Sequence, residues 1–271
     1  MSAEATNGFE QRLQQRVAVT RNPLETIPTH SISHGNIPNT PLSASTISFL
    51  LGTLFSLGAT MFLSGGFSNH WWATYQLGFF LAAWSAFHWG EFAVTAGWNL
   101  DKCSVDSFLL DNGAMYHVAN TVAVSEYVFM LYIKPSSKSY PYVSTVGQSF
   151  TPNINSIVVV LVGQALRSIA MIHASSNFSH AVAFRKRDAH KLVTDGIYSL
   201  FRHPSYAGFF YWALGTQLVL QNTISLLGFA IVLWRFFYYR IRGEEKALIS
   251  FFGKDYEEYR RTVSTKIPFI P

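Results

Sequence analysis

The sequence predicts an all-α, polytopic integral membrane protein with about six transmembrane helices. Only 13% of its 271 residues are charged and 49% are hydrophobic, whereas soluble domains contain about 25% charged residues. The charged residues are also unevenly spread. None occurs in the 65 positions between Glu25 and Glu91, or in the 32 positions between Arg202 and Arg235. An ionised side chain in the middle of a bilayer costs several kcal/mol, so these gaps predict membrane-spanning segments.

Composition divides the chain into three predicted regions. Residues 1–45 are expected to form a polar, largely mobile N-terminal tail, because they contain four prolines and lack the apolar core of a secretory signal. Residues 46–175 contain the N-terminal transmembrane helices. Residues 176–271 mix polar and charged residues with aromatic ones, and we expect them to include a helical hairpin over residues 206–240 and a cytosolic C-terminal segment.

The first two spans are expected over residues 46–63 and about 73–89. The first span is just long enough to cross about 30 Å of hydrocarbon, and its glycine and serine residues suit close packing against another helix. The second span follows the pair Trp71-Trp72 and ends near Trp89. Tryptophan residues at both ends of an apolar run are typical of the boundaries of a bilayer.

The third and fourth spans contain isolated charges. The third is expected over residues 108–133, with Asp111 and Glu126 inside it, and the fourth over residues 155–172, with the single charge Arg167. A carboxylate buried in the membrane needs a partner. We therefore expect Glu126 to pair with Arg167.

The last two spans are expected over residues 206–220 and 223–239. Only Gln221 and Asn222 separate these apolar stretches, which leaves no room for a loop. The sequence therefore predicts a tight antiparallel helical hairpin.

The basic residues indicate the orientation of the chain. Residues 185–271 contain 13 Lys or Arg against 7 Asp or Glu, and the N-terminal tail holds three further arginines. The loops expected on the opposite side offer only Lys134 and Lys138. Because basic loops stay in the cytosol, both termini are predicted to face it.

Several classes of site are excluded by the residues present. The single cysteine, Cys103, excludes an intramolecular disulfide framework and a multi-cysteine metal site. His173 and His180 have no partners at metal-ligand spacing, so no metal is expected. No zinc-finger or RNA-binding signature accompanies the basic charge, so nucleic acid is not an expected partner. His88 and Glu91 share one helical face and are expected to form interhelical hydrogen bonds rather than to act in catalysis.

The C-terminal third contains an ordered set of motifs. Its polar residues gather at the predicted cytosolic end rather than at mid-membrane, which is unlike a channel or transporter. The motifs are SVDSFLLDN at 104–112, NFSHAV at 177–182, HKLVTDGIYSLFRHPSYAGFFYWALGTQL at 190–218, WRFFYYRIRGEEKAL at 234–248 and FFGKDYEEYRRTVSTKIPFIP at 251–271.

This set closely resembles the isoprenylcysteine carboxyl methyltransferases of eukaryotes. The resemblance implies transfer of a methyl group from S-adenosylmethionine to the α-carboxylate of a C-terminal prenylated cysteine. The substrates would be CaaX-processed proteins, such as small GTPases and lamin-like proteins. The resemblance also implies a multi-pass protein of the endoplasmic reticulum membrane, with a catalytic C-terminal region that faces the cytosol.

The resemblance assigns a cofactor pocket to the region around the start of the fifth span. Pro204 suits the first turn of a helix, and free backbone N–H groups there would make the pocket polar. A helix start capped by Ser205 is the alternative interpretation. The residues implied to bind S-adenosylmethionine are His190, Lys191, Leu192, Val193, Tyr198, His203, Pro204, Ser205, Tyr206 and Glu244.

Arg240 is the candidate catalytic residue. Arg240 and Glu244 are four apart on the last predicted helix and share one face, so a surface ion pair is the alternative. Because Arg240 directly follows a long apolar run, we expect its planar guanidinium to bind both oxygens of the substrate carboxylate. Phe209 and Trp212 are candidates for lining the path of the prenyl chain, with helix packing as the alternative role.

Two other enzyme classes share a similar C-terminal arrangement, namely sterol reductases and phospholipid methyltransferases. The segments PFIP and SVDSFLLDN favour the prenylcysteine enzyme over both of them. The sequence leaves open the oligomeric state, the preferred prenyl length and the number of complete crossings.

Overall fold

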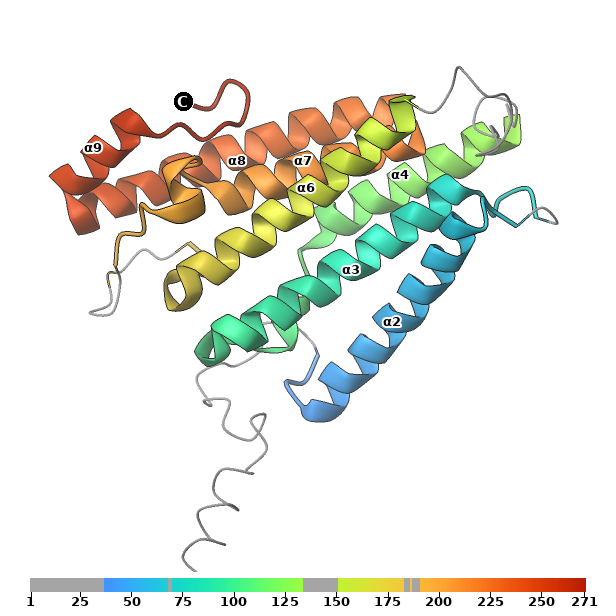
Figure 1. Cartoon of the computed structure of the whole chain (residues 1–271), viewed down its shortest axis with the longest axis horizontal. Coiled ribbons are helices and arrows are strands. Elements are labelled where there is room, and N and C mark those ends of the chain that lie inside the picture. The colour runs from blue at the N-terminus through green and yellow to red at the C-terminus, as the bar shows by residue number, and fades with distance from the viewer. Residues whose placement is uncertain (1–36, 68–69, 134–150, 183–185, 187–190) are drawn as a thin grey trace, which may run out of the picture.

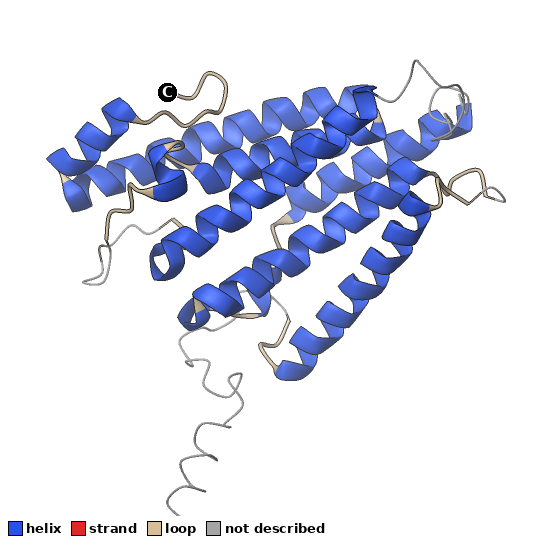
Figure 2. Ribbon diagram, in the orientation of Figure 1, coloured by secondary structure: helices blue, strands red, loops and turns tan. Residues whose placement is uncertain are grey.

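The computed structural model describes residues 37–67, 70–133, 151–182, 186 and 191–271. In these ranges every regular element is a helix, as Figure 2 shows, which agrees with the predicted all-α class. Most of the predicted N-terminal tail, residues 1–36, lies outside the described residues.

Two long helices, α2 (Pro41–Leu63) and α3 (Tyr75–Trp98), form the N-terminal pair (Figure 1). Thr40 and Thr74 cap the two helices by accepting hydrogen bonds from backbone N–H groups of the first turn. The helices approach closely at Gly58, where a Cβ atom would lie 2.7 Å from the Gly78 carbonyl oxygen. Helix α3 continues to Trp98, so its predicted end near residue 89 was wrong; no proline interrupts the stretch, and the glycines at 90 and 97 are tolerated within the helix.

Helix α4 (Ala114–Ile133) starts later than predicted. The preceding residues form a short 3-10 helix, η2 (Val105–Phe108), which ends at Leu109 in the left-handed region with a φ of 53°. Asp111 therefore lies in a connection rather than inside a span. The physical reason is the run of turn-forming residues that ends at Gly113, which has a φ of 81°.

The C-terminal half is built from α6 (Thr151–Ala174), α7 (Pro204–Leu220) and α8 (Thr223–Phe252). In Figure 1, α6 lies between α3 and α7, and α7 lies against α8. Helices α6 and α7 meet at Gly163 and Gly208, where an added Cβ atom would come within 2.8 Å of the other helix's backbone. Small residues at a helix crossing allow this approach. Helix α8 continues beyond the predicted span, which ends at residue 239, and carries both Arg240 and Glu244 as expected.

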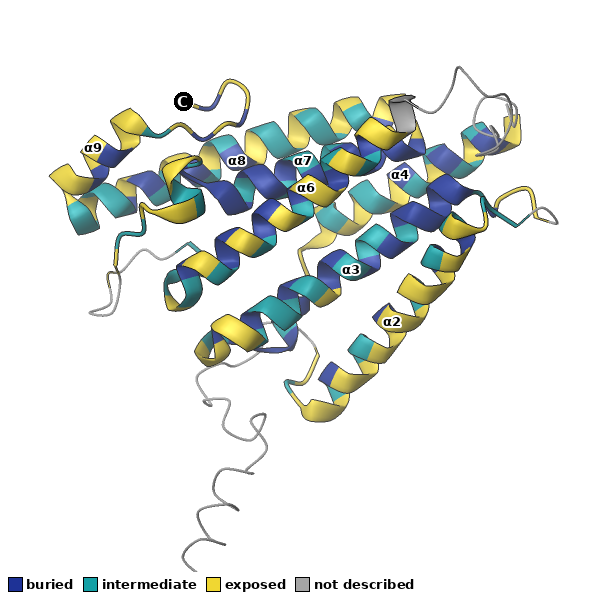
Figure 3. Ribbon diagram, in the orientation of Figure 1, coloured by how far each residue is buried: buried dark blue, intermediate teal, exposed yellow. Residues whose placement is uncertain are grey.

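Three of the described helices are long and apolar enough to cross a membrane. They are α2, α8 and the stretch Ile154–Asn177, which combines most of α6 with the short 3-10 helix η3 (Ser175–Asn177) that follows it. Together they make the chain a multi-pass membrane protein, and the number of six crossings stays a prediction. Exposure agrees with this assignment, because α2 and the start of α8 present many exposed apolar residues, whereas α7 is mostly buried (Figure 3).

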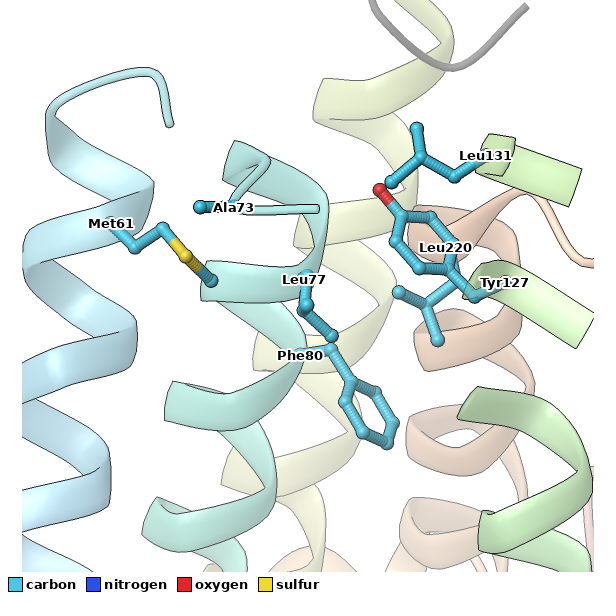
Figure 4. Close-up of a cluster of buried hydrophobic side chains, with 7 residues drawn as sticks. All are labelled: Met61, Ala73, Leu77, Phe80, Tyr127, Leu131 and Leu220. Carbon is cyan, nitrogen blue, oxygen red and sulfur yellow. The ribbon is translucent and has the colours of Figure 1, made fainter. Parts of the chain in front are cut away.

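Glu126 does not pair with Arg167, so that expectation was wrong. Its carboxylate instead accepts hydrogen bonds from the backbone N–H groups of Ile224 at 3.0 Å and Ser225 at 2.7 Å. These groups start α8, where unsatisfied N–H groups and the positive end of the helix dipole attract an anion. Glu126 thereby joins α4 to the hairpin, and the next residue of α4, Tyr127, belongs to the buried cluster drawn in Figure 4.

The chain ends in helix α9 (Lys254–Thr262) and an irregular segment that returns along the hairpin (Figure 1). The Tyr211 hydroxyl donates to the Lys266 carbonyl oxygen at 2.6 Å, and the Trp234 indole donates to that of Pro268 at 3.0 Å. These bonds fix the C-terminal segment against α7 and α8. The ends of α8 and α9 therefore lie next to the start of α7.

Candidate functional site

An open pocket lies where the start of α7 meets the second half of α8 and helix α9. A short 3-10 helix, η4 (Gly196–Ser199), and the chain just before it complete the wall. Nine of the ten residues predicted to bind a cofactor line this pocket, and the tenth, His190, lies outside the described residues. The nine are Lys191, Leu192, Val193, Tyr198, His203, Pro204, Ser205, Tyr206 and Glu244.

The local sequence explains how the pocket forms at the start of α7. His203 is the N-cap residue with an irregular backbone, and Pro204 fixes the first helical turn. The predicted free N–H groups are not all free, because those of Tyr206 and Ala207 both donate to the His203 carbonyl oxygen. The alternative in which Ser205 caps the helix was also wrong, since the cap position is His203 and lacks a side-chain cap bond.

Arg240, Tyr206 and Glu244 form a linked group at the edge of the pocket. Arg240 Nε donates to the Tyr206 hydroxyl at 3.0 Å, and this hydroxyl donates to Glu244 Oε2 at 2.6 Å. The guanidinium lies 5.3 Å from the centre of the Tyr206 ring, a cation–π distance. Arg240 also donates to the carbonyl oxygen of His180.

The Arg240 cation has no anionic partner within the described parts of the chain. It forms no ion pair with Glu244, which lies across Tyr206 from it, and so the surface ion pair considered as an alternative is absent there. The side chain is half-buried. A partly desolvated guanidinium without a carboxylate favours binding of an anionic ligand.

Residues 178–182 cross the site and hold Arg240 through His180. The His180 imidazole lies 3.7 Å from Glu91 Oε2 and 3.4 Å from Thr95 Oγ1, both on α3. Its carbonyl oxygen meanwhile accepts from Arg240. His180 therefore connects α3 with the part of α8 that carries the candidate catalytic residue.

Acidification is expected to destabilise the protein through His180. Burial lowers the pKa of His180 from 6.5 to about 4; Glu91 opposes this shift, while Arg167, Arg240 and Lys102 add to it. The folded protein thus keeps His180 neutral, whereas the unfolded chain binds a proton below pH 6.5. Stability is then lost as the pH falls from 6.5 toward 4. We expect the unfolding temperature in detergent to fall over this range, and to fall less in His180→Gln. Equal slopes for the two proteins would contradict this role.

A buried ion pair joins Glu91 and Arg167. The Arg167 guanidinium binds Glu91 through two nitrogens, with Nη2 at 2.7 Å from Oε2. Its Nη1 donates to the hydroxyl of Ser205 at 3.1 Å. Arg167 therefore reaches a residue that lines the pocket, although sequence reasoning placed it in a structural pair with Glu126. The sequence did contain a signal for this ion pair, because Glu91 and Arg167 are each the only charged residue of an apolar helix.

A second buried group holds the C-terminal segment beside the pocket. Arg202 Nε donates to Glu245 Oε1 at 2.6 Å, and His203 Nε2 lies 3.3 Å from the same oxygen. Arg202 also donates to the carbonyl oxygens of Val263, at 2.5 Å, and Pro271. Neither Arg202 nor Glu245 was among the site residues predicted from the sequence.

The two aromatic residues predicted to line a prenyl path do not line the pocket. Trp212 is 4% exposed and stacks on Phe87 with ring centres 4.4 Å apart. Phe209 is half-buried, and the Arg167 guanidinium lies 5.4 Å from its ring centre. In this arrangement Trp212 packs inside the helix bundle, which is the alternative role considered above.

Within the ranges that the structure describes, no group of three His, Cys, Asp or Glu side chains is arranged to hold a metal ion. Cys103 is buried, and burial raises its pKa to about 11. A thiol with this pKa is a poor nucleophile at neutral pH.

Comparisons with known proteins agree on one family. The model of the isoprenylcysteine carboxyl methyltransferase (ICMT) family matches residues 156–250. A protein-S-isoprenylcysteine O-methyltransferase of Xenopus laevis is 43% identical over 193 residues, which cover 71% of this chain and 64% of the frog protein. That of Schizosaccharomyces pombe is 42% identical over 83% of this chain and 93% of the yeast protein.

A solved structure is similar in its fold. It is described as the eukaryotic intramembrane Ras methyltransferase ICMT, and it matches with a TM-score of 0.73 and 33% sequence identity. The match covers 82% of this chain and 74% of the solved one.

Proposed function

The chain belongs to the isoprenylcysteine carboxyl methyltransferase family, and on this premise we propose that it methylates the α-carboxylate of C-terminal prenylated cysteines, with S-adenosylmethionine as the methyl donor. One observation carries the proposal: a half-buried Arg240 guanidinium, without an anionic partner in the described chain, beside a pocket that contains the predicted cofactor residues. The comparisons support this activity over sterol reduction or phospholipid methylation.

The residues of the pocket fit the proposed methyl donor. S-adenosylmethionine carries an ammonium and a sulfonium group, and Glu244 supplies a negative charge for them. Leu192 and Val193 supply an apolar wall, and the Lys191 backbone is held near it because its N–H donates to Asn177 Oδ1 at 2.9 Å. When bound, the donor supplies a methyl group activated by the sulfonium charge. His190, Tyr198, His203, Pro204, Ser205 and Tyr206 complete the proposed binding set.

Arg240 would bind the substrate carboxylate and orient it for direct attack on the methyl carbon. A carboxylate is ionised at neutral pH, so the reaction requires no general base. The contribution of the protein is alignment, which can supply several kcal/mol of the barrier, and removal of water from the nucleophile. The bond from Arg240 to Tyr206, and from Tyr206 to Glu244, would hold the carboxylate site and the donor site in a fixed relation.

The prenyl chain accounts for placing such an enzyme in a membrane. An apolar tail would reach the pocket laterally from the lipid, past the α7 face that carries Phe209, with Trp212 supporting this face from inside the bundle. We propose that the protein resides in the endoplasmic reticulum membrane with its pocket and both termini in the cytosol, where prenylated CaaX proteins such as small GTPases and lamin-like proteins are available.

Methyl transfer to a small prenylated substrate tests the function. Membranes that contain the protein should transfer labelled methyl groups from S-adenosylmethionine to a farnesylcysteine analogue, and the label should be lost on mild base hydrolysis of the ester. Label found only in products of phosphatidylethanolamine would instead indicate a phospholipid methyltransferase. NADPH-dependent sterol reduction without methyl transfer would indicate a reductase.

A further inference from the structure

Tyr256, in the first turns of α9, carries a buried hydroxyl group without a partner. The side chain is 1% exposed and lines the pocket. Within the described residues its hydroxyl oxygen has no hydrogen-bond partner and is closed off from water. A buried polar group in this state destabilises a folded protein, so such groups are rare and point to a missing partner.

The other tyrosines of the pocket differ from Tyr256 in this respect. The hydroxyl of Tyr198 donates to the Ala170 carbonyl oxygen at 3.2 Å, and that of Tyr206 donates to Glu244 at 2.6 Å. The hydroxyl of Tyr259, one turn after Tyr256, donates to the Tyr198 carbonyl oxygen at 2.6 Å. The fold therefore provides hydrogen-bond acceptors for the hydroxyl groups of three of the four pocket tyrosines. The fourth hydroxyl group, that of Tyr256, is available to a ligand.

The composition of the pocket changes along α8 toward the start of α9. Glu244, Leu248 and Phe252 all line the pocket at intervals of four residues, so they form one stripe along the helix. The stripe begins with a carboxylate next to Arg240 and ends with two apolar side chains. Its ends are about 12 Å apart along the helix axis. The apolar end suits an aromatic base, whereas the charged groups of an amino acid require the end near Glu244.

We propose that Tyr256 is a cofactor-binding residue whose hydroxyl group bonds to a polar atom of the nucleoside portion of the methyl donor. The inference rests on the proposed function and deepens it, because it places the nucleoside at the α9 end of the pocket and the amino-acid portion near Glu244. Since the oxygen is closed off from water, binding requires a small shift of the side chains that cover it.

Binding of the demethylated product tests this inference without a measurement of activity. The full-length protein in detergent is titrated with S-adenosylhomocysteine as wild type, as Tyr256→Phe and as Tyr259→Phe. We expect Tyr256→Phe to weaken binding about 10-fold. Its unfolding temperature without ligand should stay equal or rise, because an unsatisfied hydroxyl is removed. Tyr259→Phe is the matched control and should lower that temperature, because it loses the bond to Tyr198.

Methylthioadenosine keeps the nucleoside but lacks the amino-acid portion. It should also bind Tyr256→Phe about 10-fold more weakly than it binds the wild type. The inference fails if Tyr256→Phe binds S-adenosylhomocysteine within twofold of wild type, or if it unfolds earlier than wild type without ligand. Methylthioadenosine binding that is unchanged by Tyr256→Phe would overturn the placement of the nucleoside. A wild-type protein that binds neither compound would overturn the proposed function itself.

Discussion

Replacement of Arg240 by alanine is expected to reduce methyl transfer to a farnesylcysteine analogue by about 100- to 1000-fold, the loss typical of removing a group that orients or stabilises reacting charge. Affinity for S-adenosylhomocysteine should change only a few-fold, because Arg240 reaches the pocket through the Tyr206 hydroxyl and does not line it. The two measurements together separate a role toward the substrate carboxylate from a role in cofactor binding.

Arg242→Ala is the matched control, since Arg242 is an exposed arginine on the same helix whose guanidinium lies over Tyr238 rather than Tyr206. It should keep near wild-type activity. Arg240→Lys keeps the charge but lacks the planar fork, so it should recover only part of the rate. Loss of methyl transfer and of S-adenosylhomocysteine binding to the same extent in Arg240→Ala would show that Arg240 does not act on the carboxylate.

The predicted residues that line the pocket could be grouped from the sequence because most of them are close together in it, whereas as many other lining residues were not predicted. Eight of the nine predicted residues that line it fall between Lys191 and Tyr206, and a short stretch that wraps one helix start brings its own side chains together. Glu244 was predictable from the motif on α8. The three helices of the described chain that are apolar enough to cross a membrane were predictable because the absence of charge is a local property of the sequence.

The pairing of buried charges was not predictable in the same way. Arg167 had two possible carboxylates on other helices, Glu91 and Glu126, and the choice depends on which helices are neighbours and at what depth. In the structure α3, and not α4, packs against α6 at the depth of Arg167. Glu91 therefore forms the ion pair with Arg167. Glu126 binds the start of α8 through two backbone N–H groups and the Ser225 hydroxyl, a partner that no pattern of charged side chains indicates. Tyr256 was missed because an unsatisfied hydroxyl is visible only in three dimensions.

Replacement of Glu91 by leucine is expected to destabilise the protein by about 3–5 kcal/mol, because it leaves the Arg167 cation buried without an anion. The side chains of Glu91 and Arg167 are 1% and 9% exposed, so water cannot compensate. The loss should appear as a lower unfolding temperature and a lower yield of folded protein in detergent. Activity should fall as well, since Arg167 would no longer be fixed where it donates to Ser205 in the pocket wall.

The double variant Glu91→Leu, Arg167→Met separates the unpaired charge from the loss of the side chains. Replacing both members of a buried ion pair by apolar residues of similar volume is often nearly neutral for stability. The double variant should therefore unfold at a higher temperature than Glu91→Leu alone, while methyl transfer stays impaired because Ser205 has lost its donor. If the double variant is as unstable as the single one, the cost lies in packing between α3 and α6 and not in the uncompensated cation. If it recovers full activity, the guanidinium has no part in shaping the pocket, and Ser205 is held by the start of α7 alone.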